Sequence, residues 1–217
     1  MNVFVTGGSG YIGRALMTAL GARRHDVTAL VRPASMGRVP PAARSVIGDA
    51  LDCATFADSL RPDTTLVHLV GTPHPDPSKA NEFERVDLAS IRASVAAARR
   101  ADIAHLVYVS VAQPAPVMRA YVDARVAGEA LISEARLTAT ILRPWYVIGP
   151  GHRWPILLKP LYWIAERLPG TRDTAVRLGL VTLEQTTAAL VRAIEDPPPA
   201  GTMRIIDVSA IRAARLD

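Results

Sequence analysis

Three glycines near the start of the chain have the spacing that a phosphate-binding turn requires. Gly7, Gly10 and Gly13 form the pattern G-x-x-G-x-x-G between an apolar, β-branched run and a stretch of helical periodicity. The first glycine lets the chain turn sharply, the second leaves room for a pyrophosphate, and the third lets the helix pack closely on the sheet. The start of that helix offers free N–H groups and a positive dipole end. The pattern predicts a dinucleotide-binding turn, whose other contact residues are Ser9, Tyr11 and Ile12.

The residue that ends the second predicted strand bears on which dinucleotide binds. An acidic residue at this place accepts hydrogen bonds from the ribose hydroxyls of NAD, whereas arginine pairs with the 2′-phosphate of NADP. The strand ends in Arg32, and Arg14 follows the last glycine of the turn. This favours NADP as the cofactor, with NAD as the alternative if Arg32 is an ordinary surface arginine.

The elements that must position these residues alternate along the chain. Periodicity predicts strands at 1–6, 27–31, 46–47, 66–70, 106–110 and 139–142, and helices at 11–22, 52–60, 81–100 and 118–135. Parallel strands need crossover connections, so this alternation predicts an α/β fold, a Rossmann-type doubly wound parallel sheet. Capping-box spacing at Thr182 and Gln185 predicts a helix over 183–195, and a last strand is expected at 203–208. We expect residues 1–217 to form one domain.

Further motifs follow the glycine turn in a fixed order. They are Gly48-Asp49, Val67-His68-Leu69-Val70-Gly71, Val107-Tyr108-Val109-Ser110, Tyr121-x-x-x-Arg125 and Ile141-Leu142-Arg143-Pro144. With these motifs the chain resembles the atypical and extended short-chain dehydrogenase/reductases, NmrA-like members included, over nearly its whole length.

The resemblance implies further contacts to the cofactor. Asp49 would lie near the adenine, Val70 and Gly71 would border the adenosine and ribose, and Pro144 would lie where the chain leads from the sheet to the substrate side. An aspartate in a turn also caps the segment that follows it, which is the alternative interpretation of Asp49.

The resemblance also implies catalytic residues. In active members a tyrosine gives or takes a proton, and a lysine four residues later holds the nicotinamide ribose and lowers the tyrosine pKa. Tyr121 matches, but Arg125 stands in the place of the lysine. Both can point at one ligand from a helix, yet arginine stays protonated and cannot relay a proton. The family's serine falls within two residues of Ser110, where Val111 and Ala112 stand, so Ser110 either holds the substrate carbonyl or caps the strand end.

The histidines and the lone Cys53 do not indicate a metal site. The five histidines have no tight spacing and no accompanying set of carboxylates, so we expect no metal. His68, within an apolar strand, is predicted to be buried with a backbone partner. His74 and His152 lie on ligand-side loops, where contact with a substrate is a second interpretation.

An aromatic segment follows the sheet. Residues 145–181 hold all three tryptophans and are expected to form a small C-terminal helical, aromatic flap on the substrate side, with an apolar helix over 156–168. Such a face packs into a core, lines an apolar pocket, or meets a membrane, in that order of frequency.

The composition is that of an ordinary globular protein. Hydrophobic residues make up 49% of the chain, and the formal net charge of +5 comes mainly from arginines that are spread rather than clustered. This distribution argues against nucleic-acid binding, and peripheral membrane contact is a weaker alternative. With a single cysteine and no visible secretion signal, we expect a cytoplasmic location.

Two functions fit these residues. One is an NADP-dependent oxidoreductase acting on a small, fairly apolar carbonyl or alcohol, with Tyr121, Arg125 and Ser110 at the reacting end. The other is a non-catalytic dinucleotide-binding regulator or assembly protein, which the altered lysine and serine positions favour. The partner is accordingly a small-molecule substrate or a regulatory protein.

Overall fold

A seven-stranded parallel sheet forms the centre of the computed structural model, which describes residues 1–150 and 172–216. The strand order is β3-β2-β1-β4-β5-β6-β9, and every neighbouring pair is parallel. The strands are β1 (Asn2–Thr6), β2 (Asp26–Val31), β3 (Ala43–Ile47), β4 (Thr64–His68), β5 (His105–Val109), β6 (Ala139–Leu142) and β9 (Met203–Ile206). The predicted Rossmann-type doubly wound sheet is therefore confirmed.

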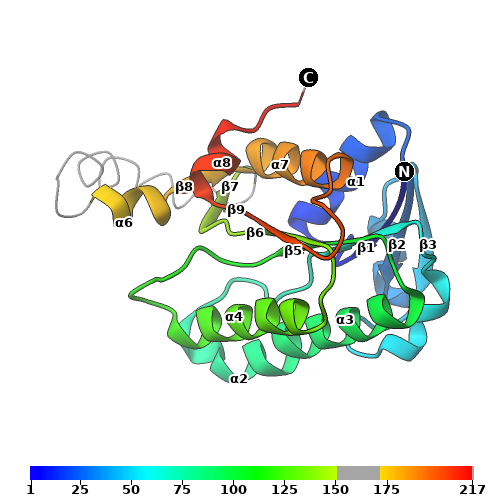
Figure 1. Ribbon diagram of the computed structural model, residues 1–217, viewed down its shortest axis with the longest axis horizontal. Coiled ribbons are helices and arrows are strands. Elements are labelled where there is room, and N and C mark those ends of the chain that lie inside the picture. Colours follow the sequence, from blue (N-terminus) through cyan, green and yellow to red (C-terminus); the bar gives the residue numbers. More distant parts are fainter. Residues whose placement is uncertain (151–171, 217) are drawn as a thin grey trace.

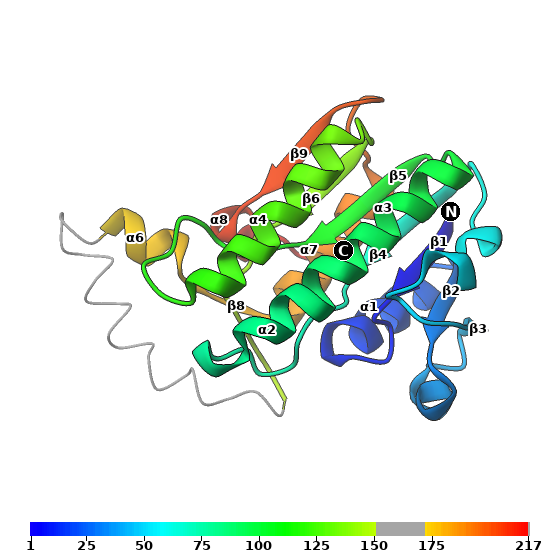
Figure 2. The ribbon, with the colours of Figure 1, turned by 90° about the horizontal axis from the view of Figure 1, so that it is seen from below.

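Helices cover both faces of this sheet, as Figure 1 shows. On one face lie α1 (Tyr11–Ala22), α7 (Leu183–Glu195) and α8 (Val208–Ala213). On the other, seen from below in Figure 2, lie α2 (Ala80–Glu82), α3 (Ala89–Ala101) and α4 (Arg119–Glu134). Beyond the carboxyl ends of the strands are a second, two-stranded sheet of β7 (Tyr146–Ile148) and β8 (Leu180–Thr182), and the short α6 (Arg172–Arg177).

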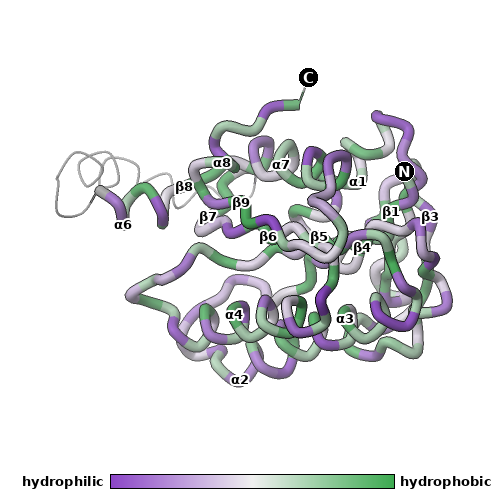
Figure 3. The backbone as a smooth tube through the Cα atoms, viewed as in Figure 1, coloured by the Kyte–Doolittle hydropathy of each residue, from purple (hydrophilic) through white to green (hydrophobic). Residues whose placement is uncertain are grey.

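The alternation of side chains along each strand builds two apolar layers. Val5 of β1 packs with Leu16 of α1 and Leu190 of α7, whereas Phe4 points to the opposite face, toward Ile91 of α3. Both layers consist of side chains with almost no exposure. In Figure 3 the helices on both faces of the sheet alternate between hydrophobic and hydrophilic residues.

The strand order reverses beside β1. The chain runs outward from β1 to β2 and β3, then returns to place β4 on the other side of β1. The loops that leave β1 and β4 diverge at this point and leave a crevice at the carboxyl ends of the strands. Open parallel sheets bind ligands in such crevices.

Most predicted elements are present, with differences at their ends and within one helix. The region 52–60 forms two short 3₁₀ turns, Cys53–Thr55 and Ala57–Ser59, instead of one helix. The helix predicted over 81–100 contains a π-helical stretch, Phe83–Leu88. The strand predicted to reach residue 208 ends at Ile206, because the Asp207 side chain accepts a hydrogen bond from Ala210 N (2.8 Å) and starts α8.

The capping box was predicted correctly. Thr182 Oγ1 accepts from Gln185 N at 3.0 Å, and Gln185 Oε1 accepts from Thr182 N at 2.9 Å. In the predicted flap, β7, α6 and β8 are present, and the pairing of β7 with β8 was not predicted. The helix expected over 156–168, with Trp154 and Trp163, lies outside the described residues.

Candidate cofactor-binding and active site

The glycine turn has the geometry that its spacing predicted. Gly7 adopts a positive φ of 76°, and a Cβ there would lie 2.7 Å from the carbonyl carbon of Leu69. A Cβ on Gly13 would lie 2.5 Å from Gly7 O and 2.6 Å from the backbone of Gly8. Side chains are therefore excluded at both positions by the backbone itself, since real Cβ atoms do not approach so closely.

Gly10 differs from the other two glycines. Among the described residues, a Cβ there would come within 4 Å of one atom, Gly7 O at 3.1 Å. Gly10 is the N-cap of α1, and no side chain caps the free N–H groups of that helix. The structure thus leaves an open space in front of a helix N-terminus, as a pyrophosphate requires.

A cleft of about 340 Å³ runs from this turn to the predicted catalytic tyrosine. The predicted residues that line it are Gly7, Gly10, Tyr11, Ile12, Gly13, Gly71, Ser110, Tyr121, Arg125 and Pro144. It is completed by Leu69, Thr72, Pro73, His74, Val109, Trp145 and Val147. The fold therefore brings together both ends of the predicted site, although they are more than a hundred residues apart in the sequence.

Ser9, Arg32, Asp49 and Val70 do not line this cleft. Arg32 and Asp49 are exposed and follow neighbouring strands, since Val31 of β2 pairs with Ile47 of β3. Asp49 Oδ1 accepts a hydrogen bond from Leu51 N at 3.0 Å, so the capping interpretation of this aspartate is realised. Contacts of Arg32 and Asp49 with a nucleotide stay predictions.

Tyr121 and Arg125 share a face of α4 but have different surroundings. Tyr121 is half-buried, and its ring packs against Phe83 with centroids 5.1 Å apart. Arg125 is buried, and its Cζ lies 5.3 Å from the centroid of the Tyr121 ring. Arg125 Nη2 donates to Asp87 Oδ1 at 2.6 Å, and Nη1 donates to Val109 O at 2.9 Å.

This ion pair keeps Arg125 charged within the protein. Burial lowers the pKa of the guanidinium, but Tyr121, Tyr108 and Asp87 raise it, and the net pKa lies above the ordinary value. Arg125 is therefore a fixed cation paired with a fully buried carboxylate. Tyr121 and Arg125 both line the cleft, and the protein's own acceptors hold the Nη atoms of Arg125.

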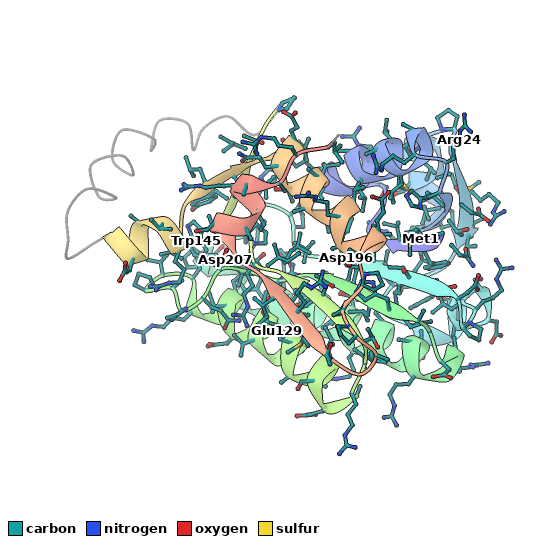
Figure 4. All side chains as sticks on the ribbon, turned by 45° about the horizontal axis from the view of Figure 1, so that its top comes forward. Met1, Arg24, Glu129, Trp145, Asp196 and Asp207 are labelled. Atoms are coloured by element: carbon teal, nitrogen blue, oxygen red, sulfur yellow. The ribbon has the colours of Figure 1, made fainter. Side chains whose placement is uncertain are left out.

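Ser110 is also held from within. Its hydroxyl donates to Glu129 Oε1, which lies on the buried face of α4, one turn after Arg125. Glu129 accepts in addition from Arg143 Nε and Gln113 Nε2, both at 3.0 Å, and from Arg143 Nη2. Figure 4 labels Glu129 on α4 and Trp145 on the segment after β6. Ser110 thus lines the cleft, but its hydroxyl proton is donated to Glu129. The hydroxyl bonds to this side chain and does not cap the strand end.

His68 is buried, as expected, but its partners are side chains rather than backbone atoms. Thr6 Oγ1 and Ser94 Oγ lie 3.1 and 2.9 Å from Nδ1, and Ser90 Oγ lies 3.3 Å from Nε2. Burial, assisted by the charge of Arg125, lowers the His68 pKa to about 3. His68 is therefore a neutral core residue at physiological pH. His74 lines the cleft, and His152 lies outside the described residues.

Sequence reasoning missed Asp87, Thr72, Gln113 and Glu129. A signal for Glu129 was present, since it follows Tyr121 and Arg125 at four-residue steps and so shares their helix face. Asp87 carries no such signal, because the π-helical turn around it changes which residues face the sheet. Within the described residues there is no group of three or more histidine, cysteine, aspartate or glutamate side chains that could hold a metal.

A protein-family model described as NAD(P)H-binding matches residues 7–152. The chain belongs to this NAD(P)H-binding family. A 3-diazoavenalumate denitrifying reductase from a Streptomyces species is 31% identical over 245 residues, which cover 99% of this chain and 79% of that protein. The family match spans every residue that lines the cleft, from Gly7 to Val147.

Solved structures agree in fold. A short-chain dehydrogenase/reductase superfamily protein from Agrobacterium tumefaciens with bound NAD has a TM-score of 0.68 at 17% identity, covering 98% of this chain and 81% of that one. A protein solved with UDP-glucose and NAD has a TM-score of 0.70 at 21% identity, covering 97% and 79%. At these identities the likeness concerns the fold.

The residues of this chain fit a dinucleotide. The space beside Gly10 is open where a side chain would stand, and α1 presents uncapped N–H groups to it. At the other end of the cleft, Arg125 Nε is buried and has no hydrogen-bond partner among the described residues. Phosphate oxygens and ribose hydroxyls are acceptors of the kind that these donors lack.

No helix among the described residues has the length and apolar character needed to cross a bilayer.

Proposed function

We propose that the chain is an NADP-dependent reductase of a small, largely apolar carbonyl compound. The observation that carries this proposal is the single cleft that joins the glycine turn to Tyr121. When bound there, the dihydronicotinamide would supply hydride to the carbonyl carbon. The reductase relative from Streptomyces supports the direction of the reaction.

Each wall of the cleft has a role in this proposal. The turn of Gly7, Gly10 and Gly13 would bind the pyrophosphate, while Tyr11 and Ile12 would flank it. Outside the cleft, Arg32 would pair with the 2′-phosphate, and Asp49, Ser9 and Val70 would border the adenosine. No carboxylate follows Val31 at the end of β2, which supports NADP over NAD.

The reacting end consists of Tyr121, Ser110 and an apolar surface. Tyr121 would donate the proton that the developing alkoxide takes up. Because the Ser110 proton goes to Glu129, Ser110 would not donate to the carbonyl oxygen, but it would accept a hydrogen bond from the hydroxyl of the alcohol product. Pro144, Trp145 and Val147 line this end and favour an apolar substrate over a charged one.

The test is NADPH consumption with a panel of aromatic and aliphatic aldehydes. Wild-type protein should oxidise NADPH with some member of the panel, and Tyr121→Phe should lower the rate by about a hundredfold or more. Tyr146→Phe is the matched control, since Tyr146 is a half-buried tyrosine outside the cleft lining, and it should keep its activity. Full activity of Tyr121→Phe would rule out the assigned acid.

A second function is favoured by a specific observation. Asp87 compensates the charge of Arg125, and Ser110 donates its proton to Glu129, so neither that charge nor that proton is available to a substrate. A dinucleotide-binding regulator or assembly protein needs no more than this. This second function predicts that the protein binds NADPH tightly but reduces no aldehyde, and that Tyr121→Phe binds NADPH as tightly as wild-type protein does.

A further inference from the structure

Asp87 lies behind the wall of the cleft and contacts two residues, Thr72 and Arg125, that line it. It is fully buried in the π-helical stretch Phe83–Leu88. Its Oδ1 accepts from Arg125 Nη2 at 2.6 Å, and its Oδ2 accepts from Thr72 N and Thr72 Oγ1 at 2.9 and 2.7 Å. One carboxylate therefore joins α4 to the loop after β4, and both of these line the cleft.

The guanidinium that Asp87 holds is fixed in one place. Arg125 Nη1 donates to Val109 O at the end of β5, and a Cβ on Gly71 would overlap Nη2. Its Cζ lies 5.3 Å from the Tyr121 ring centroid and 5.8 Å from that of Tyr108. Two acceptors on two other elements, Asp87 Oδ1 and Val109 O, therefore hold the guanidinium of Arg125 in this position.

The electrostatic field at Tyr121 therefore depends on the ion pair of Arg125 and Asp87, and not on Arg125 alone. Arg125 Cζ lies 5.3 Å from the centroid of the Tyr121 ring, so an unpaired guanidinium there would favour negative charge on the tyrosine, and the carboxylate 2.6 Å from Nη2 opposes that effect. Paired ions buried together contribute little net field at a short distance beyond them.

Two titratable side chains near the Asp87–Arg125 pair add no charge beside Tyr121. His68 has its pKa lowered to about 3 by burial and by Arg125, and burial raises the pKa of Tyr108, so both are neutral near neutral pH. On the elements packed around Tyr121, the remaining charged residues are Glu82 of α2, Glu84 and Arg85 of the π-helical stretch, Arg119, Asp123, Glu129 and Glu134 of α4, and Arg92, Arg99 and Arg100 of α3, with His74 on the cleft loop.

We infer that Asp87 is a positioning residue that fixes Arg125 against the ring of Tyr121 and compensates the positive charge there. Asp87 also ties the Thr72 loop to this guanidinium, which fixes the two walls of the cleft relative to each other. The inference rests on the proposed reductase function for its kinetic consequence, but the coupling of Asp87 to Arg125 is independent of it.

The kinetic test compares wild-type protein with Asp87→Asn. The asparagine oxygen can still accept from Thr72 N, so the change removes charge more than shape. We expect the alkaline limb of the rate profile for NADPH-dependent aldehyde reduction to move to lower pH by about one unit, because Arg125 is then uncompensated. Asp58→Asn is the control, since Asp58 pairs with Arg100 at the surface, and its profile should be unchanged. An unmoved profile in Asp87→Asn with a uniformly lower rate would overturn the inference.

A stability cycle tests the same pair without turnover. Asp87→Asn leaves a buried cation without its carboxylate, so the double variant Asp87→Asn/Arg125→Gln should melt at a higher temperature than Asp87→Asn alone. Strictly additive losses in the two single variants would overturn the inference. If Asp87→Asn does not fold while the double variant does, the coupling is confirmed in its strongest form.

The two proposals fail in different ways. Absence of turnover in wild-type protein, together with a strong coupling in the cycle, contradicts the reductase function and keeps Asp87 as the residue that positions Arg125. Turnover that is normal in wild-type protein with no coupling between Asp87 and Arg125 contradicts the inference and keeps the function.

Discussion

Glu129 is the acceptor at the centre of the hydrogen-bond network around Ser110, and its replacement should destabilise the fold. It is 6% exposed and accepts hydrogen bonds from Arg143, Gln113 and Ser110. Removal of one member of a buried ion pair costs about 3–5 kcal/mol. Because the Arg143 side chain keeps 24% exposure, water solvates part of its charge, and we expect about 3 kcal/mol for Glu129→Gln.

The assay is equilibrium unfolding by urea and by heat. For a chain of this size, about 3 kcal/mol corresponds to a fall in Tm of roughly 6–12 °C. Asp58→Asn, which breaks an exposed pair with Arg100, should change the free energy of unfolding by less than about 1 kcal/mol. If Glu129→Gln and Asp58→Asn have the same effect, the buried network around Ser110 does not stabilise the fold as described.

Three further predictions follow from the glycine turn, the end of β2 and the buried histidine. Gly13→Ala places a Cβ 2.5 Å from Gly7 O and should cost about 2 kcal/mol or more in unfolding free energy, whereas Gly37→Ala, with no atom within 4 Å, should cost almost nothing. Arg32→Ala should weaken NADPH binding by about tenfold and leave NADH binding unchanged in calorimetric titration, with the exposed Arg92→Ala as control. His68 has a folded pKa of about 3 against an unfolded value of 6.5, so below pH 6.5 the unfolded chain binds a proton that the folded chain refuses. The free energy of unfolding should therefore fall by about 1 kcal/mol per unit as pH drops from 6.5 toward 3, and His68→Asn should lack this contribution in urea titrations.

The sequence predicted the parts of the structure that depend on local pattern. The glycine spacing, the alternation of strands and helices, and the capping box at Thr182 each follow from neighbouring residues, and each is present. The convergence of Gly7 and Tyr121 on one cleft agrees with what the family resemblance implied.

What the sequence did not predict depends on contacts between distant residues. The residues near Arg125 in the sequence do not show that its guanidinium donates a hydrogen bond to Asp87, which lies 38 residues earlier. The π-helical turn rotates Asp87 toward the sheet, and periodicity of 3.6 does not describe such a turn. Ser110 and Glu129 likewise meet only after β5 packs on α4.

The central claim is that the open space beside Gly10 receives the diphosphate of a dinucleotide. Calorimetric titration of NADPH into wild-type protein and into Gly10→Val tests it directly, because among the described residues a Cβ there meets Gly7 O alone, at 3.1 Å. We predict saturable binding to wild-type protein and a loss of at least about a hundredfold in the affinity of a folded Gly10→Val protein. Equal affinity of the two proteins would contradict the claim.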